Sequence, residues 1–134
     1  MLQVTLLYLV TAGIFLGLDM IGIRWLIRPV FERHIGDLLV HPLRLGPAAL
    51  FYLAYVAGLL WLVSWPALRA GEPMQALIGG MVLGFLCYGT YEMTNLATLV
   101  AWSWEQVLID GIWGTVLTGF AAWAGVALLT GRMA

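Results

Sequence analysis

The chain has 134 residues, of which 63% are hydrophobic and only 10% are charged, against about 25% charged residues in an ordinary soluble domain. A soluble domain of this size could not bury so much apolar surface, because small domains expose a large share of theirs, so we expect lipid to surround the protein. The formal net charge of −1 provides no basic surface for nucleic acid.

Four apolar stretches reach the length of about 20 residues that a membrane-spanning helix needs. They cover residues 2–26, 47–68, 74–100 and 106–129. The first lacks the positive start of a cleavable signal peptide and runs past the length of one, so we expect it to be retained. No segment shows the alternation of a transmembrane β-barrel. The sequence thus predicts an all-α, polytopic membrane protein: one domain, residues 1–134, with four transmembrane helices.

The connection between the first two spans is the longest and holds most of the charge. Two interpretations are open. In one, Pro29 begins a short helix that lies in the membrane interface. The apolar residues that would share one face of this helix are Val30, Phe31, Ile35, Leu38 and Leu39. In the other, the segment is a plain polar loop.

Residues 69–73 and 101–105 form two short turns between the later spans. Four tryptophans lie near predicted span ends, where this side chain anchors a protein in the headgroup layer. They are Trp25, Trp65, Trp102 and Trp104.

The arginines are distributed unequally between the two sides of the predicted bundle. Arg24, Arg28, Arg33 and Arg44 lie at the first connection, and Arg69 and Arg132 lie on the opposite side. Because cytoplasmic loops carry the excess of arginine and lysine, we expect the first connection to be cytoplasmic and both termini to lie outside.

Glycines recur within three of the predicted helices, often four residues apart. They are Gly13 and Gly17, then Gly80 and Gly84, then Gly111, Gly114 and Gly119. Such small residues let helix backbones approach closely. The pattern favours packing within the chain, and it is also compatible with a homo-oligomer or with a place in a larger membrane complex.

Three carboxylates fall inside predicted spans, where ionisable groups are costly and often functional. Asp19 lies in the last third of the first helix, Glu92 in the last third of the third, and Asp110 at the start of the fourth. In an up-and-down bundle these three positions lie on the same side of the membrane. We therefore expect the acids at similar depth, toward the charged first connection.

The third and fourth helices each carry a polar face at about 100° per residue. The short turn between them makes them antiparallel neighbours, so the two faces can meet, and polar groups of the first helix close the set. The candidate ligand-binding residues are Asp19, Arg24, Tyr88, Tyr91, Glu92, Asn95, Asp110 and Trp113.

This set of residues has two interpretations. In the first it is a structural network, in which Arg24 pairs with a carboxylate and Asn95 helps to satisfy the rest. In the second it is a site for a small ligand, a proton or a cation. Three acids against one nearby arginine are unbalanced, so either burial and mutual repulsion keep carboxyl groups protonated or a positive group belongs there.

Motifs of familiar soluble enzymes are absent from the sequence. It has no nucleophile elbow, phosphate loop, HExxH motif or paired cysteines, and the single Cys87 excludes an internal disulfide. His34 and His41 lie seven residues apart in the first connection. Metal or haem ligation needs further partners that the sequence does not offer, so we expect solvated surface histidines and assign no metal. No cofactor is indicated, and enzyme activity stays open.

Two motifs resemble those of a family of small predicted bacterial membrane proteins of unknown function. Residues 88–98, YGTYEMTNLAT, resemble its core of tyrosine, glycine or alanine, threonine, tyrosine, aspartate, leucine, threonine and asparagine. Residues 110–114, DGIWG, resemble its aspartate-x-x-tryptophan-glycine. Glu92 replaces the usual aspartate, and Gly22 stands where the family tends to have tryptophan. The resemblance covers nearly the whole chain and implies four helices in a bacterial inner membrane, with no established activity.

Three functions fit these observations. The first is binding or processing of a lipid-like or small amphipathic ligand by the candidate residues, with Arg28 and Arg33 attracting an anionic headgroup. The second is a small proton-coupled transporter that works as a dimer. The third is an accessory subunit of a larger membrane complex. The convergence of polar residues at one depth favours the first.

Overall fold

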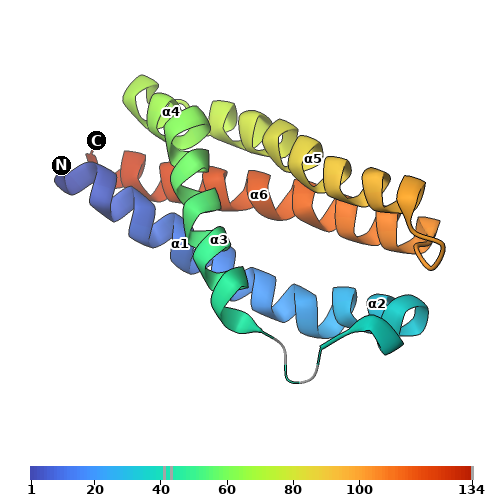
Figure 1. The fold of residues 1–134 in the computed structure, drawn as a ribbon. Coiled ribbons are helices and arrows are strands. Elements are labelled where there is room, and N and C mark those ends of the chain that lie inside the picture. Colours follow the sequence, from blue (N-terminus) through green and yellow to red (C-terminus); the bar gives the residue numbers. More distant parts are fainter. Residues whose placement is uncertain (41, 43, 134) are drawn as a thin grey trace.

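A computed structural model of the chain describes residues 1–40, 42 and 44–133. His41 lies outside the described residues, as does the side chain of Arg132, on which the predicted orientation partly depends. The described part is helical, without a strand. Four helical stretches are long and apolar enough to cross a membrane: Leu2–Leu38, Leu45–Ala70, Pro73–Thr98 and Trp104–Gly131. The predicted all-α fold with four membrane-spanning helices is confirmed (Figure 1).

The first two stretches contain π-helical or 3-10 turns, whereas the third and fourth are unbroken α-helices. The connections between the stretches are short. The elements in chain order are α1 (Leu2–Gly22), η1 (Ile23–Ile27), α2 (Arg28–Ile35), η2 (Gly36–Leu38), α3 (Leu45–Leu59), η3 (Leu60–Ser64), α4 (Trp65–Ala70), α5 (Pro73–Thr98) and α6 (Trp104–Met133).

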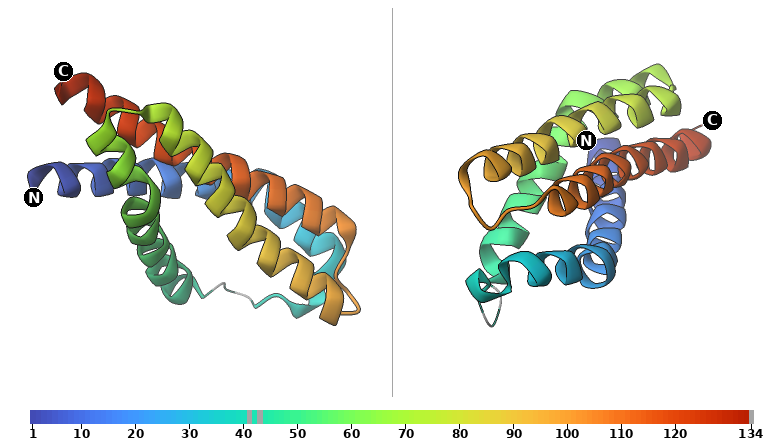
Figure 2. Two further views of the ribbon diagram at one scale, coloured as in Figure 1. Left: turned by 90° about the horizontal axis from the view of Figure 1, so that it is seen from above. Right: turned by 90° about the vertical axis from the view of Figure 1, so that its right-hand side faces the viewer.

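A short helix does begin near Pro29, but it is not the separate element that the sequence predicted. α2 continues directly from α1 through the π turn η1, so that the first helical stretch extends to Leu38. Figure 2 shows the chain bending where α1 passes into α2. Because α2 has no loop before it, its place is set by α1 and by its contacts with α6.

The two π turns share a sequence cause. Each ends two residues before a proline, η1 before Pro29 and η3 before Pro66. In each turn the last backbone N–H before the proline donates five residues back, from Arg28 to Ile23 and from Trp65 to Leu60. Proline lacks an N–H and its ring crowds the carbonyl four residues earlier, so a wider turn accommodates it within a continuous helix.

Glycine and proline make the turn between α4 and α5. Gly71 adopts the left-handed conformation with φ 69°, which an L side chain rarely takes. Its N–H donates to the Leu68 carbonyl at 3.1 Å, and the Glu72 N–H donates to Ala67 at 2.9 Å. Pro73 then occupies the first position of α5, where its missing N–H costs nothing.

The α5–α6 pair is the most extensive helix contact in the bundle, and glycines make it. A Cβ added to Gly80 would lie 2.9 Å from the Gly119 Cα and 2.9 Å from the Thr118 carbonyl oxygen. A Cβ at Gly84 would collide with the Gly114 carbonyl. The predicted close packing within the chain is therefore confirmed for these glycines.

Other glycines do not pack against a second helix. Nothing lies within 4 Å of a Cβ added at Gly13, Gly17 or Gly111, so the expectation of packing within the chain is wrong for them. On the opposite face of α1, Leu7 and Thr11 contact α6 where Gly125 leaves room. α1 and α6 thus pack along their length, and α3 lies across α1 (Figure 1).

We predict that Gly80→Val destabilises the bundle, because the new side chain meets backbone atoms of α6 that cannot move aside. The free energy of unfolding should fall by about 1–3 kcal/mol, as is usual for overpacking. Circular dichroism during titration of the detergent-solubilised protein with sodium dodecyl sulfate measures the change. Gly13→Val, the same substitution where the space is open, should stay within about 0.5 kcal/mol of the parent, and equal losses in both variants would contradict the prediction.

Candidate functional site

A pocket of about 470 Å³ lies between α3 and the other long helices. One side is the face of the first helical stretch that carries Asp19, Ile23, Ile27 and Phe31, spaced four residues apart. The other side comes from α3, α5 and the first turns of α6. The pocket therefore lies in the half of the bundle next to the first connection.

The pocket exists because α3 diverges from α5 and α6. The η3 turn and α4 contact those helices, whereas α3 itself packs mainly against α1 (Figure 2). One polar contact ties α3 to α6 across the bundle, between the Tyr55 hydroxyl and Thr118 Oγ1 at 3.0 Å. Toward its start α3 is exposed, and the pocket residue Phe51 is 72% exposed. The pocket is consequently open at the side.

Asp19 is buried on the pocket wall, with 3% of its surface exposed. The indole N–H of Trp113 donates to its Oδ1 at 3.3 Å, and Tyr52 lines the same pocket. Gly22 makes the first contact possible, because a Cβ there would overlap the Trp113 ring. The Trp113 ring, which belongs to α6, thus occupies the space beside α1 that a larger side chain at position 22 would need.

Asp110 and Glu92 form a pair of buried acids between α5 and α6. Asp110 is 8% exposed and lines the pocket, and Glu92 is fully buried. The indole N–H of Trp102 donates to Glu92 Oε1 at 2.9 Å, while Glu92 Oε2 has no partner among the described residues. The two carboxyl groups are within hydrogen-bonding range of each other. They can form that bond only when one of them carries a proton, since an ionised carboxylate accepts but does not donate.

Four tyrosines surround these acids: Tyr52, Tyr55, Tyr88 and Tyr91. The rings of Tyr55 and Tyr88 meet edge to face with centroids 6.3 Å apart. The Tyr88 hydroxyl is shielded from solvent and has no partner among the described residues. The polar end of the pocket is therefore built from carboxyl and phenol groups.

The structure brings together most of the predicted site residues. Asp19, Tyr88, Tyr91 and Asp110 line the pocket. Behind them, Trp113 and Glu92 contact Asp19 and Asp110, respectively, while Asn95 lies beside the Tyr91 hydroxyl.

Arg24 does not join the predicted set. It is exposed, and its guanidinium lies 5.4 Å from the centroid of the Trp25 ring. The residues of the first stretch that line the pocket recur every four positions from Asp19, and Arg24 does not lie on that face. The hypothesis that Arg24 neutralises a buried carboxylate is therefore wrong.

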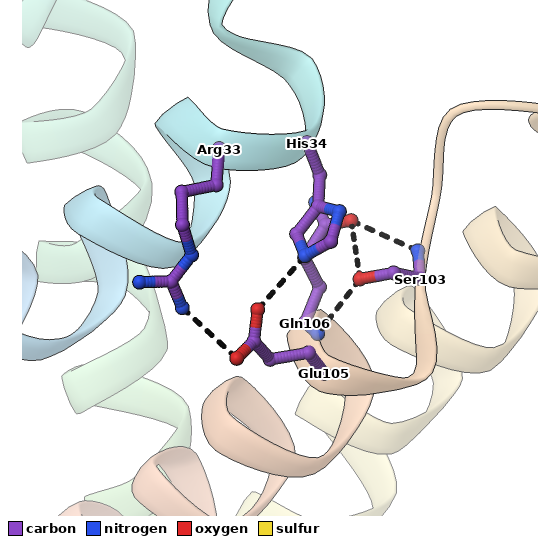
Figure 3. Close-up of polar contacts among 5 residues, drawn as sticks. All are labelled: Arg33, His34, Ser103, Glu105 and Gln106. Carbon is purple, nitrogen blue, oxygen red and sulfur yellow. Dashed lines mark hydrogen bonds and ion pairs between the residues drawn. The ribbon is translucent and has the colours of Figure 1, made fainter.

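The other cations of the first connection that were expected to attract an anionic headgroup are paired with acids. The Arg28 Nε donates to Glu32 Oε1 at 2.7 Å. Arg33 Nη2 and His34 Nε2 both contact Glu105, at 2.9 Å and 2.8 Å (Figure 3). His34 is thus not the purely solvated histidine that the sequence suggested, because its ring links α2 to the first turn of α6.

Ser103 and Gln106 cap the start of α6 beside this ion pair. The Ser103 N–H donates to Gln106 Oε1 at 2.9 Å, and the Gln106 N–H donates to Ser103 Oγ at 3.3 Å. This reciprocal arrangement satisfies two of the N–H groups that a helix start leaves unpaired. Glu105 adds negative charge at the positive end of the helix dipole.

Sequence reasoning missed several residues of the site. Tyr52 and Tyr55 were not among the candidates, although their spacing of three residues places them on one helix face. Trp102, expected as an interfacial anchor, is instead buried on Glu92. The cap was visible as the pattern Ser103-x-x-Gln106.

Within the described residues, no group of three or more histidine, cysteine or acidic side chains is placed to hold a metal ion.

One comparison with known proteins gives a match. The model of a family described as "Predicted membrane protein (DUF2177)" matches residues 4–127. No curated protein and no solved structure matches the chain.

We predict that Trp102→Phe destabilises the protein, because it removes the donor to a fully buried carboxyl oxygen while keeping an aromatic ring. The expected loss in free energy of unfolding is about 1–3 kcal/mol, the cost of leaving a buried polar group without its partner. The measurement is the same detergent titration. Trp104→Phe is the matched control, since Trp104 is 60% exposed, and it should be near neutral. A control as unstable as Trp102→Phe would contradict the role of the Glu92 contact.

Proposed function

The chain belongs to the predicted membrane protein family DUF2177, and we propose that it binds an amphipathic, lipid-like molecule in the pocket between α3 and α5. The observation that supports this proposal is the division of the pocket into two parts. Its long side is apolar, with Ile23, Ile27 and Phe31 on one face of the first stretch. Its inner end holds Asp19 and Asp110.

The length of the pocket suits a chain-like ligand. On the lining face, Phe31 lies twelve positions after Asp19, which corresponds to about 18 Å of helix at 1.5 Å per residue. A polar group held at the acids would leave an apolar tail to run along the isoleucines and phenylalanines. Ligand pockets usually have this composition, with mostly apolar walls and a few polar groups that fix the orientation.

The open side of the pocket supports entry from the bilayer. The rim residues Ala48, Phe51 and Cys87 are exposed in the isolated bundle. In a membrane, exposed apolar residues of a spanning helix face lipid tails. A ligand dissolved in the leaflet could then pass between α3 and α5 without crossing water. In this proposal the leaflet is the cytoplasmic one of a bacterial inner membrane, as the arginine distribution indicates.

The test uses native mass spectrometry of the protein in mild detergent, comparing the parent with Ala48→Trp. The large side chain at this lining position should fill the pocket, so a lipid-like adduct of fixed stoichiometry in the parent should be lost. Ala49→Trp is the matched control, because Ala49 is also exposed but does not line the pocket. It should keep the adduct.

Cys87 supplies a second readout. It is the only cysteine and it lines the pocket, so bound ligand should slow its reaction with N-ethylmaleimide. The lipids removed from the parent protein are extracted and added back to delipidated protein. They should restore the protection of Cys87 in the parent and in Ala49→Trp, but not in Ala48→Trp. Adducts that persist in Ala48→Trp, with unchanged labelling of Cys87, would show that the lipid binds elsewhere and would overturn the proposal.

A further inference from the structure

We infer that the pocket selects an amphiphile whose polar end is a protonated amine. This inference rests on the proposed binding of a lipid-like molecule and adds the chemistry of the headgroup. Four observations carry it: the acidic lining, a buried oxygen without a partner, the aromatic rings of the pocket, and the engagement of the arginines of the first helical stretch elsewhere.

The lining carries acidic side chains without a basic one. The ionisable residues on it are Asp19, Asp110, Cys87 and four tyrosines, with no arginine, lysine or histidine among the described lining residues. A third acid, Glu92, lies directly behind Asp110. A headgroup that enters this end of the pocket therefore meets acidic groups and no base. A cation compensates the charge of a carboxylate that ionises there, whereas an anion does not.

The arginines of the first helical stretch are engaged elsewhere. Arg24 lies over Trp25, Arg28 pairs with Glu32, and Arg33 pairs with Glu105. None of these contacts involves Asp19, Glu92 or Asp110. The imbalance between acids and bases thus persists in three dimensions, and an acid buried without compensation is costly in a membrane.

A buried oxygen without a partner points to the same conclusion. Glu92 is fully buried, and its Oε2 accepts no hydrogen bond from the described residues. Its neighbour in hydrogen-bonding range is the Asp110 carboxyl, which faces the pocket. A proton shared by this pair would leave one negative charge on it, and a cation in the pocket would lie next to that charge.

Aromatic rings complete the site. Tyr52, Tyr55, Tyr88 and Tyr91 line the same pocket as the two aspartates, and a ring face attracts an ammonium group, most strongly where water is excluded. A primary ammonium has three N–H donors. The two aspartates and the unpartnered Tyr88 hydroxyl provide three acceptors for them.

The experiment compares three probes with one dodecyl chain and different polar ends: dodecylammonium, dodecanol and dodecanoate. Each is titrated into delipidated protein in a neutral maltoside detergent at neutral pH, and binding is read as protection of Cys87 from N-ethylmaleimide. We expect dodecylammonium to bind at least about tenfold more tightly than dodecanol, because a hydrogen bond to a charged partner contributes more than a neutral one. Dodecanoate should bind most weakly.

Two variants locate the selectivity, and a third controls for charge alone. Asp19→Asn and Asp110→Asn should each weaken binding of dodecylammonium about tenfold and leave dodecanol nearly unchanged. Glu72→Gln also removes one negative charge, but on the exposed turn between α4 and α5, away from the pocket. It should leave all three affinities unchanged. Because the probe series on the parent protein needs no variant, the test holds even where a substitution impairs folding.

The possible failures are distinguishable. Equal protection by the three probes, abolished by Ala48→Trp, would overturn the amine headgroup and leave the proposed lipid-binding pocket standing. Preference for dodecanoate would do the same. Absence of protection by every probe, together with no adduct in the native mass spectrum, would overturn both.

Discussion

Between α5 and α6 the backbones approach until glycine carbons and carbonyl oxygens touch, at Gly80 and Gly84 on one helix and Gly114 and Gly119 on the other. Contacts this close permit only one register of the two helices, since a shift would drive side chains into the backbone. That register brings Glu92 of α5 beside Asp110 of α6. The acid pair, and with it the polar end of the pocket, depends on the glycine contact.

The lipid around the bundle supplies no water to hydrogen-bond the buried acids, so donors from the protein must form these bonds. The bundle uses indole groups for this purpose twice: Trp113 donates to Asp19, and Trp102 donates to Glu92. An indole is suited to such a place because it is apolar apart from one N–H. Tryptophan at the end of a span is therefore not always an anchor in the headgroups. Here it also donates a hydrogen bond to a buried acid, without being a base itself.

Prolines shape the space in front of these acids. The π turn η3 lies just before Pro66, at the point where the second helical stretch changes from packing on α5 and α6 to crossing away from them. η1 lies before Pro29 in the opposite wall and contributes Ile23 and Ile27 to the lining. One wall of the pocket thus contains a locally wider helix, and such turns often occur at functional sites.

The sequence by itself determined what depends on composition along the chain. Apolar length specified four spanning helices, and Gly71 with Pro73 specified the turn between α4 and α5. The order of the helices in an up-and-down bundle was enough to place the three acids near one another. Each of these features follows from local chemistry or from the order of the helices. None of them requires knowing which residues face inward.

Only the tertiary structure decided which face of each helix points to the protein. In a soluble helix the apolar face marks the interior, but here lipid makes the outer face as apolar as the inner one. Hence Arg24 was wrongly placed beside the acids, and Gly13 was expected to pack where it lies open. A π turn adds to the difficulty by shifting the helical phase, so counting at 100° per residue fails across η1. The facing of each helix is set by contacts between residues far apart in the chain, such as Trp113 with Asp19.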